Sequence, residues 1–295
     1  MIVDAPGKVV ILGEYAVVDG AQAIVRAVDR GVRCTVTASP TVQWTTPTGD
    51  DRFVARALEA VEAPAAHYTF SDWRPVESSE KVGLGGSAAA TVAAVVAAAR
   101  QAGRPVVADE VFAAAFAVHH AVQGSGSGID VAASAHGGWL SFAEGQARPL
   151  GGGPECAVVF SGQSATTGPR VQRYLALNES VRRAFVDETQ RIVEAFAITP
   201  IDAIRAGAEA LRAMADQAGI AYWTPQIEDL VRLASDHGGA AKPSGAGGGD
   251  IVVAIFDDPG AREAYERAAR SAGFLPIEVS TANGAAGSLL DSSME

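Results

Sequence analysis

The chain has 295 residues, of which 48% are hydrophobic and 19% are charged, so it can form one large or two moderate domains with a real core. Its formal net charge of −11 at pH 7 argues against nucleic acid or an anionic membrane as a partner. The N-terminus shows no signal-peptide pattern, and no apolar run is long enough for a bilayer. With Cys34 and Cys156 as its two cysteines, we expect free buried thiols and a cytoplasmic protein, either a monomer or a homodimer.

The first half of the chain predicts strands mixed with helices. Apolar runs and period-two alternation predict a buried strand over 7–13, paired strands over 23–38 and a strand over 137–142. Helical spacing predicts helices over 51–62, 87–102 and 109–122, the last of them capped by Asp109. The glycine run 151–153, followed by Pro154, is the best candidate boundary. We therefore expect domains over 1–153 and 154–295.

The second half is richer in helices. Strands are predicted over 157–160, 251–256 and 276–280, and helices over 169–177, 179–196, 201–217, 225–236 and from 259 onward. Strands and helices alternate without regular βαβ repetition. The pattern therefore favours an α+β fold in two domains.

Every lysine of the chain lies in or beside a glycine-rich loop, although the sequence contains 20 arginines and only 3 lysines. Lys8 follows Gly7, Lys81 precedes the loop 83–87, and Lys242 precedes the loop 244–249. Lysine is a compact point charge on a flexible stem, and glycine lets backbone N–H groups approach an anion closely. The combination indicates a protein that handles phosphates.

The loop 83–87 directly precedes a predicted helix, so unpaired N–H groups and the positive end of the helix dipole would face any ligand there. It is not a Walker loop, which ends in Gly-Lys-Ser/Thr. Gly83, Gly85 and Ala88 fit the dinucleotide-binding fingerprint, but that motif must follow a hydrophobic strand and none precedes it here, which argues against a dinucleotide site. The other alternative is a glycine turn that packs a helix against a sheet. Four glycines within 245–249 favour close backbone approach to a ligand, with a mobile hinge as the alternative.

In a third segment, 123–130, a run of Gly and Ser residues is followed closely by Asp130. That carboxylate could orient a nucleophile, hold Lys8 or bind Mg²⁺, whereas a turn or helix-cap role is the plainer interpretation. The neighbouring pair His119 and His120 could touch an anion or serve packing. Glu14 could support Lys8 or lie at the surface.

These segments carry a resemblance to a known family. Residues 5–18, 83–89 and 242–250 are similar, in order and spacing, to the three signature motifs of the GHMP small-molecule kinases. The resemblance implies an N-terminal α+β nucleotide domain, a ferredoxin-like C-terminal domain, and ATP and Mg²⁺ as cofactors. Lys81 and the segments 120–133, 161–167 and 242–250 are most similar to the members that phosphorylate 5-phosphomevalonate to 5-diphosphomevalonate in the mevalonate route to isoprenoids.

The resemblance also implies a set of site residues. The catalytic residues expected from it are Lys8, Lys81 and Asp130. The residues expected at ATP are Gly83, Leu84, Gly85, Gly86, Ser87 and Ala88. The residues expected at a small phosphorylated acceptor are Lys8, Glu14, Tyr15, His120, Ser127, Gly128, Ser244, Gly245 and Ala246. Ser87 is the expected protein ligand of Mg²⁺, because the acidic ligand known in related kinases has no counterpart within 116–123.

A phosphorylated acceptor fits this set of lysines. A phosphate monoester has a second pKa of about 6, so its oxygen hardly needs a general base at neutral pH. Charge neutralisation and positioning should then dominate catalysis. The alternatives are a kinase of mevalonate or another small molecule, in which Asp130 is a true base, the related decarboxylase of diphosphomevalonate, and a nucleotide-binding sensor without turnover.

Overall fold

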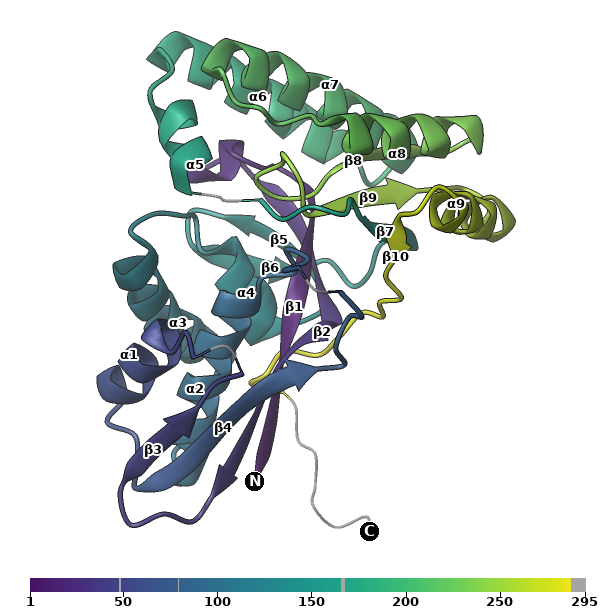
Figure 1. The fold of residues 1–295 in the computed structure, drawn as a ribbon. Coiled ribbons are helices and arrows are strands. Elements are labelled where there is room, and N and C mark those ends of the chain that lie inside the picture. The colour runs from purple at the N-terminus through teal and green to yellow at the C-terminus, as the bar shows by residue number, and fades with distance from the viewer. Residues whose placement is uncertain (48, 79, 166–167, 288–295) are drawn as a thin grey trace.

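Two sheets, each covered by helices, build the protein in this computed structural model, which describes residues 1–47, 49–78, 80–165 and 168–287 (Figure 1). The first sheet has six strands in the order β3-β4-β2-β5-β6, with β1 paired to β2. Its strands are β1 Ile2–Leu12, β2 Ala23–Thr37, β3 Val42–Thr45, β4 Ala66–Trp73, β5 Trp139–Ala143 and β6 Gln146–Pro149. A 3-10 helix, Ala16–Asp19, follows β1. The helices of this half are α1 Arg52–Ala60, α2 Gly86–Gln101, α3 Ala108–Gln123 and α4 Ile129–His136.

The second sheet has four strands in the order β10-β7-β9-β8, and all of its pairings are antiparallel. Its strands are β7 Cys156–Phe160, β8 Ala240–Pro243, β9 Ile251–Ile255 and β10 Leu275–Pro276. Its helices are α5 Gly168–Leu175, α6 Glu179–Ala195, α7 Pro200–Ala218, α8 Pro225–Asp236 and α9 Pro259–Ser271. Strands and helical segments follow one another as β-α-β-β-α-β, which is the ferredoxin-like order. The predicted α+β fold with a ferredoxin-like second half is confirmed.

The strand pair β1 and β2 connects the two halves. In Figure 1 the pair rises from the chain's N-terminus to the helices of the second half. Val9, Ile11 and Leu12 of β1 share one core cluster with Val253 and Ile255 of β9. The upper end of β1 is therefore hydrogen-bonded within the first sheet and also packed against the second sheet, which fixes the position of the residues along it.

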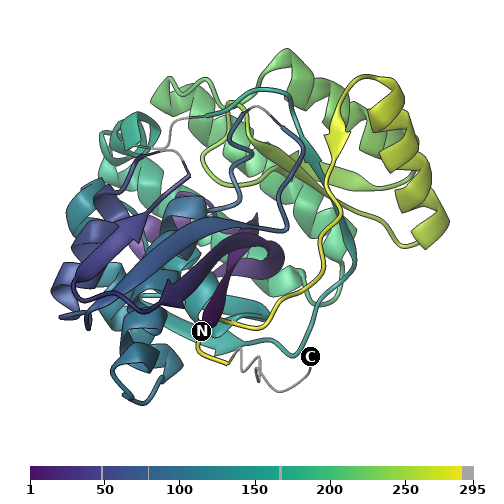
Figure 2. The same cartoon turned by 60° about the horizontal axis from the view of Figure 1, so that its bottom comes forward.

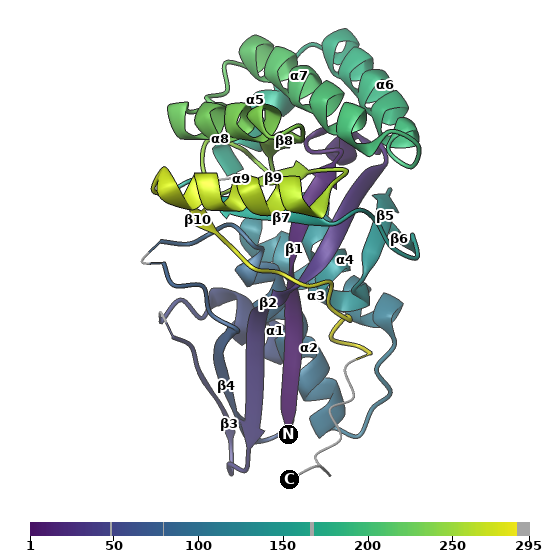
Figure 3. The same ribbon diagram turned by 90° about the vertical axis from the view of Figure 1, so that its right-hand side faces the viewer.

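The chain after β10 returns to the first sheet. Thr281 forms an antiparallel bridge with Val28, and Asn283 forms one with Gly137. The Ala285 side chain joins the core of the first half. Figure 2 and Figure 3 both show this yellow segment running from β10 to the strands of the first sheet. The division at 153/154 stays a prediction, and residues beyond β10 pack against the first half.

Several predicted elements differ from the structure. Residues 23–37 form one strand rather than a pair, because β2 is flanked by β1 along one edge and by β5 and β4 along the other. Val107, not Asp109, is the N-cap of α3, and Asp109 lies in its first turn. The predicted strand 276–280 shortens to Leu275–Pro276. The elements that the sequence pattern missed are β3, β4, β6, β8, α4 and the 3-10 helix Ala16–Asp19.

Both cysteines are free and buried, as expected. Among the residues that the structure describes, no helix combines the length and the apolar character needed to cross a membrane.

The packing of the returning segment gives a stability prediction. A Cβ at Gly284 would lie 2.2 Å from the Ala135 carbonyl oxygen and 2.4 Å from the His136 carbonyl carbon, so Gly284→Ala must displace backbone. We expect the free energy of unfolding to fall by about 1–3 kcal/mol, as for overpacked cores, measured by urea denaturation. Gly287→Ala is the matched control, because its nearest contact would be an ordinary 3.8 Å. Equal stability of the two variants would contradict the packing argument.

Candidate active site

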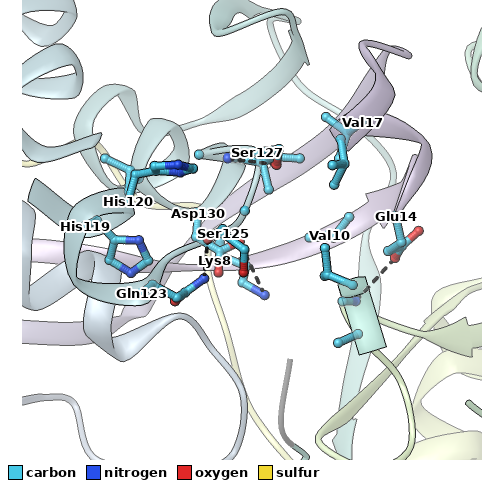
Figure 4. A pocket seen from close by; sticks show the side chains of 18 of the residues that line it. Lys8, Val10, Glu14, Val17, His119, His120, Gln123, Ser125, Ser127 and Asp130 are labelled. Atoms are coloured by element: carbon cyan, nitrogen blue, oxygen red, sulfur yellow. Dashed lines mark hydrogen bonds and ion pairs between the residues drawn. The ribbon is translucent and has the colours of Figure 1, made fainter. Parts of the chain in front are cut away.

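Lys8 occupies the point where the glycine loops meet. Its backbone N–H donates to the Leu84 carbonyl at 2.9 Å, so β1 holds the loop that precedes α2. Its ammonium lies 3.6 Å from Oδ1 of Asp130 (Figure 4). A Cβ at Gly85 would lie 3.1 Å from Lys8 Cγ, and a Cβ at Gly245 would lie 3.5 Å from Lys8 Nζ. One ammonium therefore borders two glycine loops and one carboxylate.

The loop 83–87 has the geometry of an anion site. Gly85 is the N-cap of α2 with φ +81°, and no side chain caps the helix there. The first N–H groups of α2 are thus available to a ligand, and the helix dipole adds a partial positive charge. Gly83, at φ +78°, packs against Asp250, because a Cβ there would lie 2.5 Å from that side chain.

Ser87 is bonded to a histidine that our site prediction omitted. Its Oγ lies 3.1 Å from Nε2 of His119. The His119 ring stacks on Phe53 with 5.0 Å between ring centroids. Burial lowers the pKa of His119, and the nearby Asp130 carboxylate partly opposes that shift.

Asp130 stands in the first turn of α4. Gly128 is the N-cap of that helix with φ +89°, and a Cβ there would lie 2.7 Å from the Phe116 ring. Glycine is therefore required at 128 both for its backbone angle and for space. The Asp130 carboxylate is about one-third exposed, so it can meet a ligand as well as Lys8.

Glu14 and Lys242 form a buried ion pair. The Lys242 ammonium donates to Oε1 of Glu14 and, at 2.8 Å, to the Pro243 carbonyl. The Lys242 side chain is fully buried; burial lowers its pKa, and Glu14 partly opposes that shift. Glu14 therefore bonds with Lys242 and not with Lys8, and Lys242 lies on β8 instead of in a loop. The Gly245 N–H donates to the same Glu14 oxygen at 3.4 Å, so the pair also holds the glycine loop.

The loop after β8 is held by hydrogen bonds to residues of the first half. Ser244 Oγ accepts the Val10 N–H at 2.9 Å, and the Tyr15 hydroxyl donates to the Ala246 carbonyl at 2.8 Å. Burial raises the pKa of Tyr15, so that hydroxyl keeps its proton. Ser244, which was expected at the acceptor, is bonded to the backbone of β1 and does not line the cavity.

A cavity of about 120 Å³ lies between these elements. The predicted acceptor and catalytic residues that line it are Lys8, Glu14, Tyr15, His120, Ser127, Gly128, Asp130, Gly245 and Ala246. The lining residues that were not predicted as site residues include Val10, Val17, Phe116, His119, Gln123, Ser125 and Ile129. Gln123 and Ser125 stand in the Gly/Ser run that drew attention to Asp130, and this was the available signal for them. The roles of all these residues stay predictions.

Lys81 lies apart from this cavity. The residue is exposed, does not line the cavity, and its carbonyl accepts the Ser164 hydroxyl at 2.8 Å. The loop residues 83–88 also lie outside the lining, although a Cβ at Gly85 would lie only 3.1 Å from Lys8 Cγ. The geometry therefore brings together Lys8, Asp130 and the α2 N-terminus, but not Lys81.

The site offers Mg²⁺ few protein ligands. The described residues contain no group of three or more His, Cys, Asp or Glu side chains that could hold a metal ion. The oxygen donors beside the α2 N-terminus and the loop before it include Ser87 Oγ, the Asp130 carboxylate and the Asp250 carboxylate, which lies against Gly83. Mg²⁺ usually takes one or two protein oxygens together with phosphates and water, so this set fits an ion that arrives with a nucleotide.

Comparisons with known proteins show matches along most of the chain. Residues 52–138 match the family model "GHMP kinases N terminal domain" and residues 200–274 match "GHMP kinases C terminal". Phosphomevalonate kinase of Streptomyces sp. (strain CL190) is 30% identical, over 94% of this chain and 96% of its own. Mevalonate kinase of Aeropyrum pernix is 28% identical, over 86% of this chain and 88% of its own.

Solved structures show the same fold. The Lin0012 protein from Listeria innocua superposes with a TM-score of 0.88 at 23% identity, over 96% of this chain and 98% of that one. Phosphomevalonate kinase of Streptococcus pneumoniae, in complex with phosphomevalonate and AMPPNP, gives 0.80 at 16% identity, over 96% and 100%.

The buried pair gives a second stability prediction. Lys242→Met leaves the Glu14 carboxylate buried without its partner, so we expect the free energy of unfolding to fall by about 3–5 kcal/mol, measured by chemical denaturation. Adding Glu14→Gln should recover part of the loss. Arg205→Met is the control, because its pair with Asp202 is more than half exposed on both sides and should contribute less than about 1 kcal/mol. Similar losses for Lys242→Met and Arg205→Met would show that the buried pair does not stabilise the fold.

Proposed function

The chain belongs to the GHMP kinase family, and we propose that it transfers the γ-phosphoryl group of ATP to the phosphate of 5-phosphomevalonate, giving 5-diphosphomevalonate and ADP. An acceptor phosphate oxygen forms the new bond to the γ-phosphorus, and the bond from that phosphorus to the β,γ-bridging oxygen breaks. The 30% identity to the Streptomyces phosphomevalonate kinase over nearly the whole chain supports this acceptor.

The position of Lys8 carries the proposal. Its ammonium lies between the α2 N-terminus, where ATP phosphates would be bound by the loop 83–88, and the cavity, where the acceptor would lie. Both substrates are anionic, so their mutual repulsion is the main obstacle to reaction. A buried ammonium between them neutralises charge where it concentrates in the transition state.

Asp130 and Ser87 complete the proposed machinery. Asp130 orients the Lys8 ammonium at 3.6 Å, and it need not remove a proton from an acceptor that is already ionised. Mg²⁺ bound with ATP would neutralise the β- and γ-phosphate oxygens, and Ser87 Oγ would be its protein ligand. Backbone N–H groups of the loop orient the phosphates, which leaves the transferring group facing Lys8.

Mevalonate is the second candidate acceptor. Lys81, which the sequence suggested for an acceptor phosphate, is exposed and outside the cavity, and mevalonate kinases are among the relatives. An alcohol must lose a proton during transfer, so Asp130 would then act as a general base.

An acceptor screen tests the reaction. Purified protein with MgATP should release ADP with 5-phosphomevalonate and respond much more weakly to mevalonate, homoserine and galactose, in a coupled ADP assay. Equal or greater turnover of mevalonate would overturn the proposed acceptor. Release of CO₂ from diphosphomevalonate would indicate the decarboxylase, and nucleotide binding without turnover would indicate a sensor.

Lys8→Met tests the residue that carries the proposal. Removing one charge aimed at the transition state should lower kcat by about 10²–10³-fold, while circular dichroism shows an intact fold. Asp130→Asn should lower kcat less than Lys8→Met if the acceptor is a phosphate, and at least as much if the acceptor is an alcohol. Near-normal kcat for Lys8→Met would remove this lysine from the mechanism.

Lys81→Ala separates a charged acceptor from a neutral one. If the exposed ammonium swings toward the acceptor phosphate during turnover, its loss should raise KM for phosphomevalonate by about tenfold, since a charge-assisted contact contributes about 1.5–3 kcal/mol. The dissociation constant of ATP, measured without acceptor, should change less. A change in ATP binding alone would make Lys81 a nucleotide residue.

A further inference from the structure

His119 joins the nucleotide side of the site to the cavity. It lies on α3, its Nε2 is 3.1 Å from Ser87 Oγ, and its ring lines the cavity beside Gln123 and Asp130 (Figure 4). Among the described residues, the His119 ring makes this one hydrogen bond. Ser87 is the second residue of α2, in the first turn after the N-cap Gly85, which provides no side-chain cap, and phosphates and their metal would bind there.

The His119 ring is held in place by packing. It is 7% exposed and stacks on Phe53 at an interplanar angle of 27°. A ring fixed in this way presents Nε2 to Ser87 without loss of side-chain freedom when a ligand binds. Such prior fixation of a supporting side chain is what allows it to orient a functional group.

The direction of the hydrogen bond decides what Ser87 can do. A serine hydroxyl has one hydrogen and two acceptor lone pairs. If the hydroxyl donates to Nε2, its hydrogen is turned away from the phosphate loop and both lone pairs stay free for a cation. If the hydroxyl pointed its hydrogen at the loop, it would favour an anion and repel the metal ion instead.

We propose that His119 is a positioning residue, which accepts the Ser87 hydroxyl hydrogen at Nε2 and thereby directs the Ser87 oxygen at the Mg²⁺ ion that accompanies ATP. The inference rests on the proposed kinase function and adds a protein group that acts on the metal through Ser87. The proton of the neutral ring then sits on Nδ1.

A double-mutant cycle on binding tests this role without turnover. The dissociation constant of AMPPNP, a non-hydrolysable ATP analogue, is measured with Mg²⁺ and again with EDTA, for the wild type, Ser87→Ala, His119→Phe and the double variant. Phe keeps an aromatic ring against Phe53 but cannot accept a hydrogen bond. Each single variant should lose about fivefold to tenfold in affinity for Mg²⁺–AMPPNP, the size expected for one hydrogen bond, with little change in EDTA.

The double variant should lose no more than the larger single loss, because both changes remove the same interaction. His119→Gln should recover part of the affinity, since an amide oxygen can also accept the hydroxyl hydrogen. His67→Phe is the matched control: His67 on β4 bonds the hydroxyl of Thr45 on β3 at 2.9 Å in an exposed position, outside the cavity lining, and its loss should leave AMPPNP binding unchanged.

Additive losses, or unchanged Mg²⁺–AMPPNP binding by a folded His119→Phe, would overturn the role of His119 while the kinase proposal stands. If His119→Phe fails to fold, His119→Leu, which also cannot accept a hydrogen bond, replaces it in the cycle under the same criterion. A wild-type chain that binds no AMPPNP under either condition would overturn the kinase proposal itself, and the inference with it.

Discussion

The packing of Lys8 among glycines is the constraint on which the rest of the site depends. Its stem and ammonium pass so close to Gly85 and Gly245 that a side chain at either position would contact the lysine. Both glycines also have φ near +80° to +90°, which L side chains rarely adopt. β1 places this lysine, because the strand is bonded to β2 along its length and packs against the second sheet at its upper end. The ammonium is thus fixed where the two halves meet.

The three lysines have three different environments, and this explains both the success and the limit of the sequence analysis. Their shared glycine-rich context correctly pointed to one family. Context could not tell that Lys242 is fully buried and bonded to Glu14, because that pair joins residues 228 positions apart. A buried ammonium needs such a partner, since an unpaired buried charge is very costly. Lys242 is bonded to Glu14 and Lys81 is exposed, so Lys8 is the lysine whose side chain lines the cavity.

Elements with strong local patterns were predictable, and elements defined by distant partners were not. The apolar run of β9 and the alanine-rich α2 are recognisable from sequence alone. β8 was missed because Lys242 and Pro243 are residues typical of a loop. Proline is tolerated in this strand because β8 lies at the edge of its sheet. The helix α4 was missed because its eight residues follow directly on a Gly/Ser run. His119 lacked any signal beyond its neighbour His120, since its contact with Ser87 spans two helices.

The charge balance of the cavity limits how this protein can bind anions. Lys8 lies 3.6 Å from Asp130, and Lys242 is paired with Glu14 behind them. Among the described residues, the cavity lining contains one lysine, Lys8, and no arginine, in keeping with a chain of formal charge −11. Fixed dipoles, which are the N–H groups of the loop 83–87 and the N-terminus of α2, and the cation that ATP brings would add to the attraction of Lys8 for phosphates. Backbone dipoles act over a short range, so they favour phosphates bound at the loop. The acceptor would then be selected by the shape of the cavity and by the hydrogen-bonding groups that line it. Lys8 would have to interact with both the transferring phosphoryl group and the acceptor. Discrimination between a phosphorylated and an uncharged acceptor would then depend on how strongly the Lys8 ammonium interacts with each of them.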